Sequence, residues 1–144
     1  MPQIDPNEAL RNVPYCAWLG LTARVEDGAV ILDMPFDAKL IGNPILPALH
    51  GGVTGSLLET AAIVQILWET GATALPKPVD ITIDYLRTGR AVASHARATL
   101  ARQGRRVINA RAEMWQEDAA KPVASFRGHF LLSQSRVTNT EQLG

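Results

Sequence analysis

The sequence contains little of what marks several classes of protein: it has one cysteine, no excess of either charge and few aromatic residues. A single cysteine, Cys16, cannot form an intramolecular disulfide, which excludes a disulfide-stabilised scaffold. Fourteen basic residues against fourteen acidic ones leave no basic excess for binding nucleic acid or an anionic membrane surface. No apolar signal segment follows Met1, because Pro2 and Asp5 interrupt it. We therefore expect a cytoplasmic protein without a nucleic-acid or membrane partner.

Length and composition indicate one folded domain. A chain of 144 residues with 47% apolar and 19% charged residues is too apolar for disorder, and at this length a domain buries about 68–70% of its unfolded surface. We find no internal repeat and no linker. We expect the folded core to span about residues 13–133, followed by a polar, frayed tail over 134–144.

The charges are balanced in number but uneven in position. Between Lys39 and Glu69 the one formally charged residue is Glu59. Residues 51–70 are apolar on nearly every face, which is the pattern of a long buried helix, and Gly71 is a plausible C-cap. The length alone would fit a membrane span, but glycines, hydroxyl residues and Glu59 interrupt the run.

The rest of the chain predicts short helical turns and strands. We expect helical turns over 7–18, a hairpin over 21–35 around Asp27-Gly28, and a loop over 37–47. After the long helix, alternating segments predict strands over 78–87, 91–102, 105–116 and 123–133. The expected fold is therefore α+β, with one long central helix wrapped by a curved antiparallel sheet of five to six strands.

Two features are candidates for catalysis. Glu59 is either a buried acid paired with an arginine or a carboxylate that acts as general base or nucleophile. His50-Gly51-Gly52 opens the helix, where unpaired N–H groups favour a developing oxyanion, although a flexible helix entry explains the glycines equally well. Nine residues separate His50 from Glu59, which corresponds to about 900° of rotation and about 13.5 Å along the axis. The two residues would therefore project on nearly opposite sides of the helix and could not easily reach one substrate atom within one chain. This spacing predicts a dimer in which each site combines two subunits.

The segment LHGGVTGSLLETAA (49–62) resembles the signature of hotdog-fold acyl-CoA thioesterases, of the phenylacetate-pathway and 4-hydroxybenzoyl-CoA thioesterase type. DITIDYLRTGRA (80–91) is similar to the strand that follows the helix in that family. The resemblance implies a hotdog fold and hydrolysis of an acyl- or aroyl-CoA. Glu59 would attack the thioester or activate water, and the Gly51 N–H of a neighbouring subunit would hold the carbonyl oxygen. It also implies at least a homodimer, up to a homotetramer built as a dimer of dimers, and no cofactor beyond the coenzyme A of the substrate.

The sequence departs from that family at two positions. Pro44 stands where several relatives carry an amide that contacts the carbonyl, so we transfer this role to the neighbouring Asn43. Ile63 stands where some relatives hold the attacking water with a hydroxyl, and Thr60 is the nearest substitute. We also assign Gly52 to substrate binding, and we expect residues such as Ala61, Ala62 and Trp68, with the loop 41–49, to line the acyl pocket.

Arginine outnumbers lysine among the basic residues, since only Lys39, Lys77 and Lys121 are lysine. Guanidinium groups suit the phosphates of coenzyme A. The arginines that follow or flank strand ends are the candidates for these contacts, although a solvated rim explains any single one: Arg87, Arg90, Arg105 and Arg106. His95 and His129 lack metal-ligand spacing, so we predict no metal site.

Two other functions stay open at this point. A hotdog dehydratase or hydratase acting on 3-hydroxyacyl or enoyl thioesters would pair an acid with a histidine, and His50 is the histidine near Glu59. A non-catalytic acyl-CoA-binding protein or sensor would bind the same ligand without turnover. The acid retained inside the helix argues against the sensor.

Overall fold

The computed structural model describes residues 4–102 and 105–133. The expected tail 134–144 and residues 103–104, between two of the expected strands, lie outside these residues. The elements, in chain order, are α1 (Pro6–Arg11), α2 (Pro14–Leu19), β1 (Thr22–Glu26), β2 (Ala29–Met34), a 3-10 turn (Ala38–Leu40), β3 (Ile41–Asn43), β4 (Ala48–Leu49), α3 (Gly51–Thr70), β5 (Lys77–Tyr85), β6 (Ser94–Arg102), β7 (Val107–Trp115) and β8 (Ala124–Leu131).

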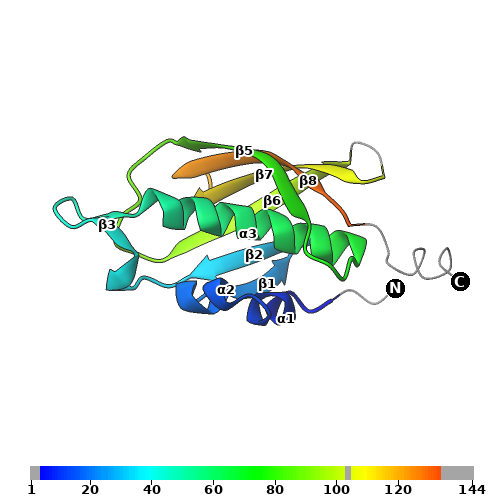
Figure 1. Cartoon of the computed structure of the whole chain (residues 1–144). Coiled ribbons are helices and arrows are strands. Elements are labelled where there is room, and N and C mark those ends of the chain that lie inside the picture. Colours follow the sequence, from blue (N-terminus) through cyan, green and yellow to red (C-terminus); the bar gives the residue numbers. More distant parts are fainter. Residues whose placement is uncertain (1–3, 103–104, 134–144) are drawn as a thin grey trace, which may run out of the picture.

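Six strands form one antiparallel sheet in the order β1-β2-β6-β7-β8-β5, and the sheet curves around α3 (Figure 1). Strands β7 and β8 place small or apolar side chains on the inner face at every second position, with Ala112 opposite Phe126 and Ile108 opposite Phe130. This alternation seals the concave face against the helix. The predicted α+β fold with a wrapped central helix is confirmed.

Helix α3 runs over the predicted residues and is capped at both ends. His50 is the N-cap, and Gly71 closes the helix in the left-handed conformation, at a φ of 70°. Leu57, Leu58 and Ile66 are fully buried against the sheet, as expected for a helix that is apolar nearly all round. Among the described residues, no helix is long and apolar enough to cross a membrane.

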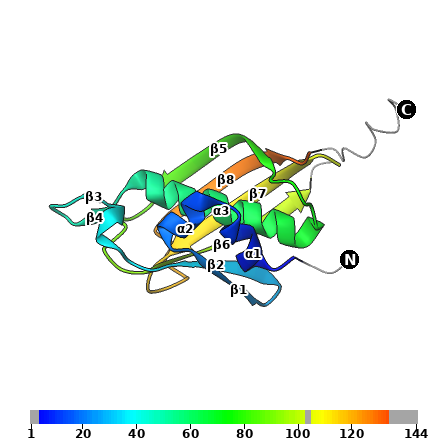
Figure 2. The ribbon, with the colours of Figure 1, turned by 60° about the horizontal axis from the view of Figure 1, so that its bottom comes forward.

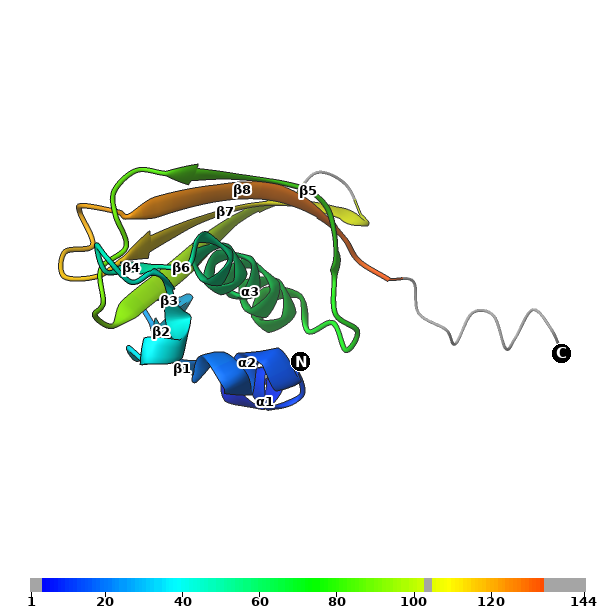
Figure 3. The ribbon, with the colours of Figure 1, turned by 60° about the vertical axis from the view of Figure 1, so that its left-hand side comes forward.

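The N-terminal helices cover the side of α3 that the sheet leaves open, as Figures 2 and 3 show. Helix α1 contacts both β1 and α3, and Leu10 belongs to the core although it precedes the expected boundary at residue 13. The expected loop 37–47 was wrong in part, because Ile41–Asn43 pairs with Ala48–Leu49 as a short hairpin. This pairing could not be predicted, because strands of three and two residues are too short to show an alternating pattern in the sequence.

Strand β5 forms one edge of the sheet and pairs with β8 alone among the described strands. Ile81, Ile83 and Tyr85 have the parity expected for inward-facing residues, but Ile81 is 44% exposed and Tyr85 is 57% exposed. Only Ile83 packs against the core, beside Gly55 of α3. The edge strand therefore extends past the cover that one helix provides, which leaves an apolar row uncovered.

Candidate active site

Glu59 lies in the middle of α3 and is half-buried. It lines a cavity of about 230 Å3 between α3 and the N-terminal helices, and it is the one carboxylate among the described residues that line it. The other lining residues are mostly apolar: Ala9, Leu10, Val13, Tyr15, Cys16, Ser56, Thr60, Ile63, Val64, Leu67 and Leu75. Glu59 forms no ion pair with any described residue. Its carboxylate is therefore available to act as a base or nucleophile in this cavity.

The N-terminus of α3 presents one unpaired N–H group. The Gly52 N–H donates to Nδ1 of His50 at 2.9 Å, so this N–H already has a partner within the chain, and the assignment of Gly52 to substrate binding stays a prediction. Within the described part of the chain, the Gly51 N–H has no hydrogen-bond partner. The Tyr85 hydroxyl donates to the Gly51 carbonyl oxygen at 2.8 Å and so holds the next peptide, between Gly51 and Gly52, in place. An unpaired N–H at a helix N-terminus suits an oxyanion.

Gly51 and Glu59 cannot reach the same carbonyl within one chain. Eight residues of helix separate them by about 12 Å along the axis. His50 is a cap with extended backbone (φ −62°, ψ 132°) and is not a helical residue, so the helical rotation between His50 and Glu59 does not fix the direction of its side chain. Instead Gly51, Gly55 and Glu59 follow one another at four-residue steps along one side of the helix. The separation itself remains the reason to look to a second subunit.

The two substitutes for the missing family residues lie at different places. Asn43 is exposed in the β3–β4 hairpin that leads into α3, and its Oδ1 accepts the Ile45 N–H at 3.0 Å. Thr60 lines the cavity beside Glu59, and its hydroxyl donates to the Ser56 carbonyl oxygen at 2.7 Å. Thr60 is therefore next to the candidate acid in the middle of the helix, whereas Asn43 lies near the N-terminal end of the helix.

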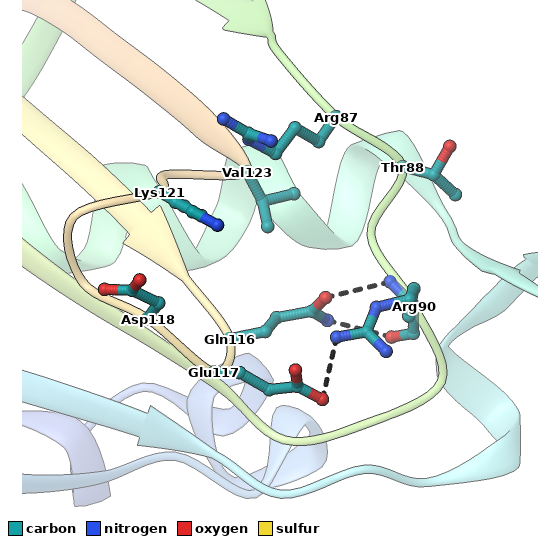
Figure 4. Close-up of a pocket in the computed structure, with 8 residues that line it drawn as sticks. All are labelled: Arg87, Thr88, Arg90, Gln116, Glu117, Asp118, Lys121 and Val123. Atoms are coloured by element: carbon teal, nitrogen blue, oxygen red, sulfur yellow. Dashed lines mark hydrogen bonds and ion pairs between the residues drawn. The ribbon is translucent and has the colours of Figure 1, made fainter.

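Arg87 and Arg90 line a polar, open cavity of about 550 Å3 beyond the end of β5 (Figure 4). Arg90 is paired with Glu117 at 2.8 Å, and its backbone N–H and carbonyl are both bound by the amide of Gln116. Lys121 lines the same cavity, as do Glu117 and Asp118, so three cations and two carboxylates gather there. Bidentate and cationic groups of this kind suit phosphate oxygens.

Arg105 and Arg106 lie at the opposite end of the sheet, beyond the far end of β6. The nine residues of β6 span roughly 27 Å. Both side chains are exposed, and the Arg106 carbonyl accepts the Leu132 N–H at 2.7 Å. The four arginines therefore do not form one phosphate site within one chain. Among the described residues, no three His, Cys, Asp or Glu side chains gather where they could hold a metal ion.

Comparison with known proteins now decides the family. A family model described as the acyl-CoA thioesterase N-terminal domain matches residues 43–131, which include both candidate residues of α3, Gly51 and Glu59, and strands β5 to β8. The chain belongs to this acyl-CoA thioesterase family. As a member, it is a thioester hydrolase, and the resemblance seen in residues 49–62 is confirmed. This assignment favours hydrolysis over the dehydratase and sensor alternatives.

Individual proteins that resemble this thioesterase in sequence or structure agree with the family assignment. It is 30% identical over 121 residues to the medium/long-chain acyl-CoA thioesterase YigI of Salmonella typhimurium, covering 74% of this chain and 78% of that one. A solved protein of Chromobacterium violaceum is 36% identical, with 88% of each chain covered and a TM-score of 0.71. A phenylacetic acid degradation-related protein of Ralstonia eutropha JMP134 is 25% identical, covering 88% of this chain and 98% of that one, with a TM-score of 0.74.

Three residues with a hydroxyl or thiol group line the Glu59 cavity of the thioesterase and were not predicted from the sequence. Ser56 lies three residues before Glu59, a spacing that puts both on one helix face and could have indicated it. Tyr15 and Cys16 come from α2, and no local pattern connects them to the helix. Burial raises the pKa of the Cys16 thiol, and its hydrogen bond with Thr60 offsets part of the rise. Ala61 and Ala62, expected at the acyl pocket, are buried in the core instead.

Proposed function

We propose that this thioesterase hydrolyses the thioester of an acyl- or aroyl-CoA, with Glu59 as general base or nucleophile. The observation that carries the proposal is the half-buried Glu59 carboxylate in a cavity lined mostly by apolar side chains. The family to which the chain belongs supports this chemistry. The name of its relative YigI supports an acyl-CoA with a medium or long chain as the substrate.

The proposed site combines Glu59 of one subunit with the Gly51 N–H of its neighbour. The uncovered edge of β5, with Val79, Ile81 and Tyr85 exposed, supports an interface along this strand. A twofold pairing of two β5 edges would set the two α3 helices side by side, so that each N-terminus could face the other's Glu59. A homodimer is therefore the smallest active unit, and a homotetramer would be a dimer of such dimers.

The reaction balances without any further reagent than water. As a general base, Glu59 takes a proton from water while the hydroxyl attacks the carbonyl carbon, and the Gly51 N–H donates to the oxyanion. Collapse of this intermediate breaks the C–S bond, and the proton on Glu59 passes to the departing thiolate. As a nucleophile, Glu59 would attack the carbonyl carbon and displace the coenzyme A thiolate, which breaks the C–S bond and leaves an anhydride. Water then cleaves the anhydride, which regenerates the Glu59 carboxylate, and the proton released from water passes to the thiolate. Both routes yield a free acid and coenzyme A.

The phosphates of coenzyme A are assigned to the cavity of Arg87, Arg90 and Lys121. Arg90 would exchange its exposed partner Glu117 for a phosphate, at little cost because surface ion pairs are weak. Arg105 and Arg106 could serve the same substrate only from another subunit. The proposal needs no metal and no cofactor beyond the coenzyme A of the substrate, and it retains the cytoplasmic location expected from the sequence.

Replacing the carboxylate tests the proposal. We expect Glu59→Gln and Glu59→Ala to lower kcat by about 100-fold or more, because general acid–base catalysis contributes roughly 10²–10⁴. The assay is release of free thiol from a panel of acetyl-, butyryl-, octanoyl-, decanoyl-, palmitoyl-, benzoyl- and phenylacetyl-CoA. Circular dichroism and sedimentation would show that fold and assembly are kept. Near-normal turnover by either variant on every substrate would refute the role of Glu59.

Mixing inactive protomers tests whether the site is shared. Gly51→Pro removes the N–H at the first helical position, where proline is well tolerated. Each mixed dimer of Glu59→Gln and Gly51→Pro protomers contains one site with both native groups, so random mixing should restore about a quarter of wild-type activity if the twofold interface is shared. No recovery above the two parent variants would refute a site that combines Glu59 of one subunit with Gly51 of its neighbour.

A further inference from the structure

A second cavity adjoins the one that contains Glu59. It has a volume of about 250 Å3 and lies between α1, the C-terminal end of α3 and the segment after that helix. Ala9, Val13, Leu67 and Leu75 line both cavities, so the two lie side by side at these side chains. We call the two cavities together the α1–α3 channel. Figure 3 shows α1 and α2 lying along α3 on the side away from β7 and β8.

The channel begins at the candidate carboxylate and follows the helix axis. Glu59, Ile63 and Leu67 stand four residues apart on α3 and line the first cavity in that order. Leu10, Val13 and Leu75 close the opposite wall with apolar side chains. A substrate whose carbonyl lies at Glu59 would therefore extend its acyl group toward Leu67. Such a wall favours a hydrocarbon chain, since each buried methylene contributes about 0.8 kcal/mol.

The length of the first cavity sets the length of the acyl chain that it can hold. Eight residues from Glu59 to Leu67 correspond to about 12 Å of helix. An extended chain of single bonds advances about 1.2 Å per bond, one third of the rise of an extended peptide residue. About ten bonds fit between the carboxylate and Leu67. A longer chain would enter the second cavity.

The far end of the channel is acidic. Asp5, Glu8 and Asn12 line the second cavity beside apolar residues such as Ile4 and Ala72, and both carboxylates are exposed. Arg11 faces Asp5 at 3.8 Å and neutralises part of its charge, whereas Glu8 forms no ion pair with any residue that the structure describes. A second carboxylate at the end of an acyl chain would be repelled there. A methyl end would not.

We propose that the preferred substrate is a straight aliphatic acyl-CoA of about eight to ten carbons that ends in a methyl group, bound in the α1–α3 channel. This deepens the proposed function and rests on it, because Glu59 fixes where the carbonyl lies. Aroyl groups would occupy the first cavity only. Dicarboxylic acyl groups are excluded by Glu8.

Blocking the junction of the two cavities tests the chain length. Ala9→Phe adds an aromatic ring from α1, and Leu75→Trp adds one at a half-exposed position that tolerates substitution. In both, kcat/KM for decanoyl-CoA relative to butyryl-CoA should fall at least about tenfold, because several methylenes lose their apolar surroundings. Ala17→Phe is the control, since Ala17 is exposed on α2 and lines neither cavity. An unchanged ratio in a folded Leu75→Trp variant would overturn the channel.

Reversing one charge tests the acidic end. Glu8→Lys should raise kcat/KM for ω-carboxydecanoyl-CoA relative to decanoyl-CoA by about tenfold or more, because repulsion becomes attraction. Glu113→Lys is the matched control, because Glu113 is exposed on the outer face of β7. If both variants change the ratio equally, or neither changes it, Glu8 does not select against the carboxylate.

Binding to the Glu59→Gln variant separates this proposal from the proposed function. Calorimetry should give a lower Kd for decanoyl-CoA than for butyryl-CoA, by about tenfold or more. If that preference is found while Glu59→Gln still hydrolyses normally, the channel stands and the role of Glu59 fails. If Glu59→Gln abolishes hydrolysis but binds both ligands equally, Glu59 stands and the channel is overturned.

Discussion

Gln65 provides a direct measure of how α3 is fixed to the sheet. Its side chain is 3% exposed, and its Oε1 accepts the Val30 N–H at 2.8 Å. Val30 is itself 1% exposed, so this N–H has no access to water once the acceptor is gone. Gln65→Met keeps the length and volume of the side chain, which keeps the packing change small. Leaving a buried donor unpaired costs about 1–3 kcal/mol.

The expected loss is large enough to measure. For a domain of this size, a destabilisation of about 2 kcal/mol lowers Tm by about 4–8 °C. Urea unfolding followed by tryptophan fluorescence, at one fixed protomer concentration because assembly affects stability, would give the free energy of unfolding and the m-value.

The control for Gln65 is Glu69→Gln. Nε2 of Gln65 donates to the exposed Glu69 carboxylate at 2.9 Å, and an exposed bond of this kind contributes little. We therefore expect Glu69→Gln to lie within about 0.5 kcal/mol of the wild type. A loss below about 0.5 kcal/mol for Gln65→Met, or an equal loss in both variants, would refute the reasoning.

Three further predictions concern the Cys16 thiol and the phosphate cavity. Because burial raises the pKa of Cys16 above its ordinary value of 9.0, a thiol reagent at pH 8 should label it fast only after unfolding. The stability that this shift contributes is complete below pH 9.0 and is lost at higher pH, so the free energy of unfolding should fall there in the wild type and not in Cys16→Ala. Arg87→Ala should raise KM for acyl-CoA about tenfold, with no such rise for an N-acetylcysteamine thioester, which has no phosphates; equal rises for both would contradict phosphate binding.

Much of the fold could be predicted from periodicity. The helix over 51–70 and the alternation of Ile108, Ala110 and Ala112 follow directly from local sequence, because burial on one face imposes a fixed period. The exposure of Ile81 could not be predicted, since it depends on where β5 lies in the sheet. A pattern shows which side chains point inward but not whether anything covers them.

The candidate site was predictable in part for the same reason. Glu59 stood out because a lone acid in an apolar run is unusual. The Gly51 and Gly52 N–H groups looked equivalent in the sequence, and only the geometry shows that His50 occupies the second. Tyr15 lies more than forty residues from the acid, and it meets Ser56 only because α2 folds back onto α3. Contacts of this kind have no local signature.

The position of the N-terminal helices has a consequence for how such enzymes diverge. The family model covers residues 43–131, and α1 and α2 lie outside it. The helix that holds Glu59 and the strands β5 to β8 that wrap it thus lie within the family model, whereas one wall of the cavity beside Glu59 comes from a segment ahead of the match. Substitutions in about fifteen residues could remodel that wall without touching the reacting groups or the sheet. Selectivity and chemistry would then be inherited separately along a single short chain.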